Sequence, residues 1–173
     1  MPTFTTVLPI LGPNAPGVQA NIYWADVSVI ATIAPINAAT LEVTAISMVA
    51  PTDKFKLLAI VREDSMIKDD MNGATDSIHY VEELTVRVKG MEPEIMAALN
   101  AGAGQRCVVL VQQPSGVVNI MGNKTNYAEI TAMSSDSGKA GSSDRKGTVL
   151  TIKSIGHMHK LPFLTAGVLD TLI

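Results

Sequence analysis

The order of apolar and polar positions along the chain predicts a protein built mainly from β-strands. In His79–Lys89, the apolar residues Leu84, Val86 and Val88 alternate with polar ones, as in a strand with one buried face. Seven further segments are rich in the β-branched, aromatic or other apolar residues that favour strands. These segments are residues 21–33, 41–49, 55–61, 107–112, 117–121, 127–133 and 148–155.

One short α-helix is predicted at about residues 92–102. Pro93 suits the first helical position, and Glu94 lies where the positive end of the helix dipole favours an acidic group. A single short helix among many strands predicts a mainly β fold, a β-sandwich or barrel with one flanking helix, because a parallel α/β fold would need several helices. Apolar residues follow at helical spacing before a closing glycine: Ile95, Met96, Leu99 and Gly102.

Turn residues and polar runs predict how the strands are connected. Residues 113–116, Gln-Pro-Ser-Gly, separate two apolar strands and predict a hairpin. Long polar loops are expected at residues 63–77 and 134–147. Residues 1–18 are uncharged and contain four prolines, so we expect an extended apolar N-terminal arm, with residues 19–173 forming a single β domain.

The composition points to a surface that is partly covered by other molecules. Hydrophobic residues make up 47% of the chain and charged residues only 17%, against roughly 25% charged residues in typical soluble domains. We therefore expect a surface rich in small polar residues and covered in part by neighbouring subunits. The net charge of −3 gives no reason to expect a nucleic-acid partner, because duplex binding needs a basic stripe.

Cysteine use and the apolar runs give expectations about the compartment. Cys107 is the single cysteine, so the chain forms no intrachain disulfide. The first residues lack the pattern of a signal peptide, and no apolar run reaches the length of about 20 residues that crosses a membrane. We expect a soluble protein made in a reducing compartment.

His157 and His159 are the residues most typical of a site. Residues two apart in a strand share a face, so both imidazoles would reach one metal ion. A catalytic zinc site needs a third ligand, which no nearby Cys, Asp or Glu supplies, and we prefer a polar edge near the C-terminus.

The acidic pairs are interpreted as surface charges. Glu82 and Glu83 are neighbours on a predicted strand and therefore face opposite ways. Together with the pairs at residues 63–64 and 69–70, they are expected to be solvated or to form ion pairs between subunits. Cys107 opens an apolar strand and is expected to pack as a small hydrophobic residue. We predict no catalytic residue, no cofactor, no metal ligand and a protein that is not an enzyme.

Residues 106–155 carry a succession of short motifs around an apolar strand and a hairpin. The motifs are Gly122–Asn123, the alternating strand near Glu129, Ser137–Gly138–Lys139, and Asp144–Arg145–Lys146–Gly147 leading into another strand. In these fifty residues, under a third of the chain, the sequence resembles virion structural proteins of tailed bacteriophages, of the tail tube or tube-like connector family.

The resemblance implies a self-assembling subunit whose closed rings stack around a DNA channel. Joining the sheet edges of neighbouring copies into one wall would leave no strand edge unpaired. The expected partners are copies of the chain and other tail or neck proteins, with DNA only as transient non-specific cargo and no membrane. The expected location is the virion tail, assembled in the host bacterial cytoplasm.

Two alternatives stay open. A head–tail connector, a stopper or a capsid-decorating protein belongs to the same class and could share the β fold. A β-barrel binding module or a small metalloenzyme that uses His157 and His159 belongs to another class.

Overall fold

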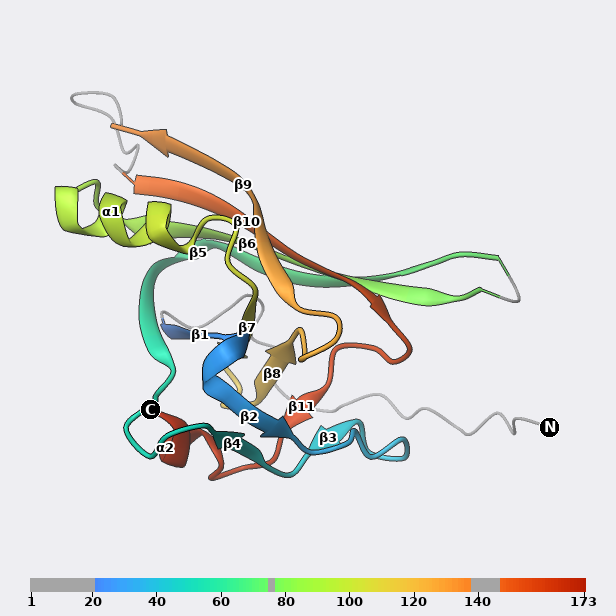
Figure 1. Ribbon diagram of the computed structural model, residues 1–173. Coiled ribbons are helices and arrows are strands. Elements are labelled where there is room, and N and C mark those ends of the chain that lie inside the picture. Colours follow the sequence, from blue (N-terminus) through green and yellow to red (C-terminus); the bar gives the residue numbers. More distant parts are fainter. Residues whose placement is uncertain (1–20, 75–76, 138–146) are drawn as a thin grey trace.

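The fold is given by a computed structural model that describes residues 21–74, 77–137 and 147–173; the arm expected at residues 1–18 lies outside this range. Most elements of the described part are strands, and the long strands lie side by side (Figure 1). In chain order the elements are β1 (Asn21–Asp26), the 3-10 helix η1 (Val27–Val29), β2 (Ile30–Ile33), β3 (Glu42–Val43), β4 (Ile46–Met48), β5 (Lys56–Asn72), β6 (His79–Lys89), α1 (Pro93–Gly102), β7 (Cys107–Gln112), β8 (Val118–Met121), β9 (Ala128–Asp136), β10 (Gly147–His157), β11 (Phe163–Leu164) and α2 (Leu169–Leu172).

The protein is mainly β, as the sequence predicted, and antiparallel pairing joins part of the sheet into a closed barrel, one of the two architectures that the sequence left open. The circuit runs from β1 through β5, β6, β10, β9 and β7, and β7 pairs back with β1. β8, β11 and β3 extend the sheet from β7, and β2 and β4 form a separate small sheet. The predicted helix is confirmed as α1, which lies beside the barrel (Figure 1).

Strand β7 separates two apolar cores, which explains why its sequence is apolar at consecutive positions. Val109 and Val111 pack inside the barrel with the buried rows of β6 and β10. Val108 and Leu110 point the other way and pack in a second cluster that includes Leu172 of α2. All of these side chains are buried, so β7 is the central strand of the fold.

The strands β5, β6, β10 and β9 form a four-stranded sheet that continues beyond the barrel. In Figure 1 the β5–β6 hairpin (green) projects far from the body. The prediction of a loop at residues 63–77 is therefore wrong, because β5 continues to Asn72 and pairs with β6 as far as His79. Only one face of this part of β5 meets the core, so its solvent face carries the mixed charges that resemble a loop.

Other boundaries refine the sequence expectations. The hairpin between β7 and β8 is confirmed, and Gly116 adopts the positive φ of +87° that such a turn needs. The loop predicted at residues 134–147 starts later, because β9 continues to Asp136; residues 138–146 lie outside the described range. β11 and α2 were not predicted. Within the described residues, no helix has both the length and the apolar character needed to cross a membrane.

Candidate functional site

A row of polar residues crosses three strands at one end of the barrel. Asp69 on β5 pairs with Glu82 on β6, and Glu82 pairs with Ser154 on β10. Glu82 continues the buried row of β6 and Ser154 continues that of β10, so both side chains point into the barrel. Neither is accessible, since Glu82 is fully buried and Ser154 is 1% exposed.

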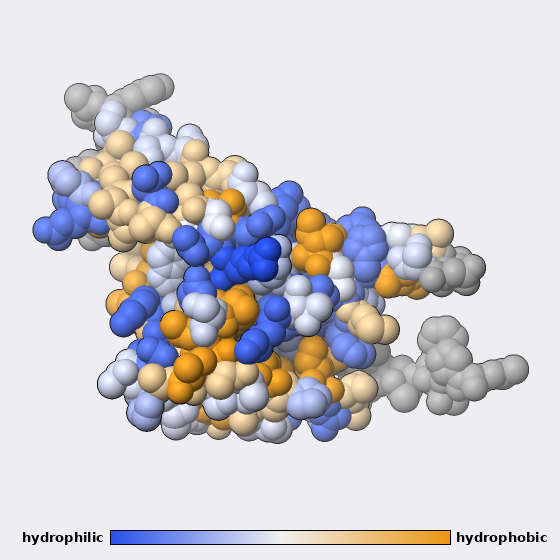
Figure 2. All heavy atoms as spheres, viewed as in Figure 1, coloured by the Kyte–Doolittle hydropathy of each residue, from blue (hydrophilic) through white to orange (hydrophobic). Residues whose placement is uncertain are grey.

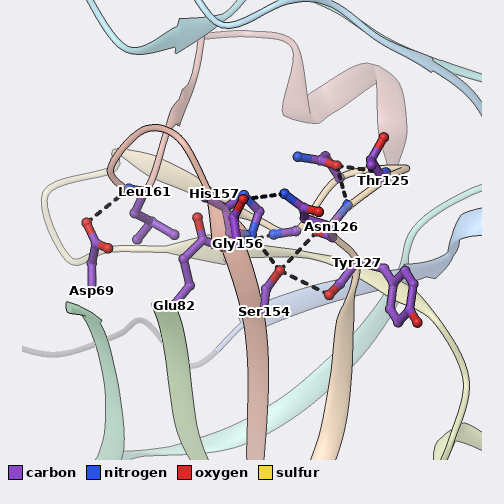
Figure 3. A network of polar contacts seen from close by, with 11 residues as sticks. Asp69, Glu82, Thr125, Asn126, Tyr127, Ser154, Gly156, His157 and Leu161 are labelled. Carbon is purple, nitrogen blue, oxygen red and sulfur yellow. Dashed lines mark hydrogen bonds and ion pairs between the residues drawn. The ribbon is translucent and has the colours of Figure 1, made fainter. Parts of the chain in front are cut away.

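His157 closes this end of the barrel over Glu82 and Ser154 (Figure 3). The regular pairing of β10 shifts just before His157, at Gly156, whose φ of +88° turns the chain. This irregularity brings His157 Nε2 to 2.6 Å from Ser154 Oγ and 3.4 Å from Glu82 Oε2. The ring is buried with them.

The hydrogen bonds of the Ser154 hydroxyl indicate which nitrogen of the imidazole carries the proton. Ser154 Oγ lies 3.0 Å from the backbone oxygens of both Asn126 and Tyr127. Because a hydroxyl has one proton to donate, Ser154 donates it to one of these carbonyls and accepts a hydrogen bond from the Nε2–H of His157. The network thus assigns the Nε2–H tautomer to a neutral His157.

Gly122 supplies the backbone partner of the buried acid. Its N–H donates to Glu82 Oε2 over 3.0 Å. Gly122 has a φ of +82°, and a Cβ atom there would lie 2.7 Å from the backbone nitrogen of Ala128. Glycine is therefore required for this approach. The second oxygen, Glu82 Oε1, is buried and has no hydrogen-bond partner among the described residues.

Burial keeps Glu82 and His157 neutral. It raises the pKa of Glu82 to about 8; the Gly122 hydrogen bond opposes this shift, and the charge of Asp69 adds to it. Burial also lowers the pKa of His157. At pH 7 the structure therefore holds a protonated Glu82 beside an uncharged His157, not an ion pair.

This geometry differs from that of a nucleophile–base–acid relay. In such a relay, the serine and the carboxylate contact opposite nitrogens of the imidazole. Here Ser154 and Glu82 both approach Nε2 of His157. The Ser154 hydroxyl is also buried and turned toward two backbone carbonyls, so it is not presented to a substrate.

The cluster of Asp69, Glu82, Ser154 and His157 instead anchors two turns to the barrel end. Asn126, in the turn after β8, donates from Nδ2 to the backbone oxygen of Gly156 over 2.7 Å. The N–H of Leu161, in the turn after β10, donates to Asp69 Oδ2 over 3.1 Å. These contacts hold the turns in place around the polar row (Figure 3).

A pocket of about 550 Å³ lies beside the cluster, and Glu82, His157 and His159 are among its lining residues. The two histidines therefore line one pocket, but not by the alternation that the sequence suggested. β10 ends at His157, and His159 follows in an exposed bend. Within the described ranges, no three or more His, Cys, Asp or Glu side chains are grouped to hold a metal ion.

The sequence analysis misplaced Glu82 although a signal was present. Glu82 and Glu83 do face opposite sides, as predicted, but the expectation that both are surface charges is wrong for Glu82. Its position two residues before Leu84 places it on the buried face of β6. The prediction for Cys107 is confirmed: it is buried, its Sγ lies 3.2 Å from the backbone oxygen of Ala128, and burial raises the pKa of the thiol to about 12.

The other face of the same strands is polar and open to solvent. Glu83 lies between Lys68, at 3.2 Å, and Lys153, at 2.6 Å. Its carboxyl pKa is lowered chiefly by the hydrogen bond from Lys153. Arg87 Nε lies 2.9 Å from Asp64 Oδ2 on the neighbouring strand. This face therefore carries charges of both signs, paired across the strands.

Comparisons of the chain with protein-family models, with curated proteins and with solved structures returned no match.

Proposed function

We propose that this chain is a structural subunit that joins copies of itself edge to edge into a ring, and that it forms the tail tube of a tailed bacteriophage. Two open strand edges carry the proposal. β5 pairs with β1 only through residues 56–59, and β9 pairs with β7 only at Ala128. Residues 60–72 and 129–136 thus expose one edge each that has no strand partner within the described residues. Such edges favour the addition of another strand.

The strand directions allow this contact to repeat. Each neighbouring pair in the order β5–β6–β10–β9 is antiparallel, so β9 runs opposite to β5. A copy rotated about an axis along the strands presents its β5 antiparallel to β9 of the first subunit. Repeating this heterologous contact closes a ring with a continuous antiparallel sheet, and the ring has no open edge.

The projecting β5–β6 hairpin supports the same role. It carries the exposed apolar side chains of Met71 (62% exposed) and Ile78 (49%). Met66 (53%) is exposed nearer the body, opposite Thr85. Figure 2 shows apolar spheres among hydrophilic ones along this projection. An isolated hairpin with such side chains gains stability when a neighbouring subunit covers them. The low content of charged residues, 17%, fits a chain whose surface is largely covered on assembly.

The solvent face of the four-stranded sheet suits the wall of a channel. The barrel core lies behind the sheet, so in a ring of this kind the body is outside and the free face lines the channel. The paired charges of Lys68, Glu83, Lys153 and their neighbours nearly balance on this face. A wall without a basic stripe lets duplex DNA pass without strong binding.

Negative-stain electron microscopy of the purified protein over a concentration series tests the proposal, with sedimentation velocity as a second readout. Stacked rings or tubes are the expected result. Single rings that do not stack would replace the tail tube by the connector or stopper alternative. A monomer at all concentrations, up to the solubility limit, would overturn edge-to-edge assembly. Deleting residues 2–16 tests separately whether the N-terminal arm is needed.

A binding module is the second candidate, and the pocket beside the cluster favours it. The pocket contains both histidines, and its lining includes Glu82, whose buried Oε1 has no partner among the described residues. Isothermal titration with Zn²⁺ tests this candidate, with His159→Ala as the variant that removes the exposed imidazole. Binding that is lost in this variant would support a metal-binding module, and no heat of binding would eliminate the metal-binding form of this candidate.

A further inference from the structure

A row of alternating charge crosses the free face of the four-stranded sheet. Lys68 on β5 lies opposite Glu83 on β6, Glu83 lies opposite Lys153 on β10, and Lys153 lies opposite Glu129 on β9. The distances from Glu83 to the two lysines, 3.2 Å and 2.6 Å, show that the first three members of the row are paired within the subunit. The row begins with a positive charge on one open edge and ends with a negative charge on the other.

Both ends of the row are accessible. The Lys68 side chain is 42% exposed, and Glu129 is exposed. Glu129 makes no ion pair with any residue that the structure describes. It also lies immediately after Ala128, at the point where β9 leaves β7 and its edge becomes open. The charges at the two open edges are therefore complementary. Lys68 also contacts Glu83 and Asp70 within its own subunit, but its exposed ammonium group has three N–H donors and can add a carboxylate from another copy.

We propose that the row continues from one subunit to the next, with Glu129 of one copy opposite Lys68 of its neighbour, and that this contact sets the register in which β9 pairs with β5. This inference rests on the edge-to-edge assembly proposed above. In the closed ring, lysine and glutamate then alternate around the whole wall at one level.

Neighbouring registers lack this complementarity. A slip of one residue turns the side chains of the added strand to the opposite face, which buries polar groups. A slip of two residues places Glu129 opposite Met66 or opposite Asp70, the residues that flank Lys68 on the same face of β5. The first partner is apolar and the second repels Glu129, because like charges placed directly opposite destabilise a strand pair.

Two charge reversals, studied separately and mixed, test the register. Glu129→Lys places lysine opposite Lys68 of the neighbour, and Lys68→Glu places glutamate opposite Glu129. We expect each variant alone to need a roughly tenfold higher concentration for half-assembly than the wild type, from repulsion repeated at each contact. In an equimolar mixture, the lysine introduced at position 129 meets the glutamate introduced at position 68, and assembly returns toward the wild-type concentration.

The mixture distinguishes an interface effect from a folding defect. Each variant keeps its altered contacts within the subunit when it is mixed, so only a change between subunits explains rescue. Glu94→Lys, an equal charge reversal on α1, serves as the control and is expected to assemble like the wild type. Circular dichroism checks that each variant is folded, and sedimentation velocity measures assembly.

The contrary outcomes separate this inference from the function on which it rests. Rings from the wild type and equally from both single variants would overturn the register and leave edge-to-edge assembly standing. Two impaired variants that do not rescue each other would also overturn the register. A wild type that never assembles would overturn both proposals.

Discussion

The buried acid Glu82 makes the stability of the fold depend on pH in the direction opposite to that of a paired surface carboxylate. Its pKa is about 8 in the folded state and 4.5 without the protein environment. Between these values the folded protein keeps a proton that the unfolded chain has released. Raising the pH therefore destabilises the fold, and the contribution of Glu82 is complete below pH 4.5 and lost as the pH rises through 8.

The size of this effect follows from the two pKa values. They differ by about 3.5 pH units, and at about 1.36 kcal/mol per unit the contribution is about 5 kcal/mol. Glu82→Gln keeps the shape and an oxygen for the Gly122 N–H but cannot ionise. The free energy of unfolding of the wild type, minus that of this variant, is expected to fall by about 4 kcal/mol between pH 5 and pH 9, which is most of the full effect.

His157 acts in the opposite direction. Burial lowers its pKa below the usual 6.5, so its contribution is complete above that value and lost as the pH falls toward the folded-state pKa. The wild type and Glu82→Gln both keep this histidine, so the part of its contribution that does not depend on Glu82 cancels in the difference. Its Nε2 lies 3.4 Å from Glu82 Oε2, so the difference reports the acid together with its coupling to His157.

Urea denaturation followed by circular dichroism measures the difference from pH 5 to pH 9, at concentrations where both proteins are monomeric. Glu83→Gln is the matched control on the same strand. The pKa of Glu83 is lowered by its lysine partners, so its contribution is lost only as the pH falls below 4.5, and its difference is flat above pH 5.5. A flat curve for Glu82→Gln, or one that rises with pH, would mean that Glu82 is ionised in the fold and that the neutral assignment is wrong.

Three further predictions test the packing by urea denaturation and thiol labelling. Gly122→Ala is expected to destabilise the fold by about 2–4 kcal/mol, because a positive φ and a backbone clash combine, whereas Gly104→Ala, with a φ of +76° in open space, costs only about 1 kcal/mol. Leu110→Ala is expected to cost about 2–5 kcal/mol, whereas the exposed Leu57→Ala changes stability by less than about 0.5 kcal/mol. Cys107 is expected to resist a thiol reagent at pH 8 until urea unfolds the chain, because its pKa is about 12.

The parts of the fold that the sequence predicted well are those in which local pattern and burial agree. β6 and β7 have the predicted boundaries, one from alternation and the other from a continuous apolar run. The extension of β5 was missed because the strand leaves the barrel and keeps only one face against the core. Its hydrophobic pattern is therefore weak, and its strand conformation depends on pairing with β6.

The candidate site, too, could be predicted from the sequence only in part. Glu82 could have been placed inside the barrel from the alternation of β6, since it continues the row of Leu84. The contact of His157 with Ser154 could not have been predicted. Regular alternation would place these two residues on opposite faces of β10, and only the irregularity at Gly156 brings them together. Asp69 joins Glu82 only through the register of β5 against β6, which a single strand does not reveal.

The buried row and the charged row are two consequences of one register. Lys68, Glu83 and Lys153 each stand next in the chain to Asp69, Glu82 and Ser154, and the two rows lie on opposite faces at the same level of the sheet. Slipping β5 or β10 by one residue against β6 would turn a lysine into the barrel beside Glu82 and move its polar partner into solvent. The buried polar row inside therefore fixes the order of charges outside. In the assembly proposed here, a subunit with this register presents complementary charges at its two open edges before it meets a neighbour.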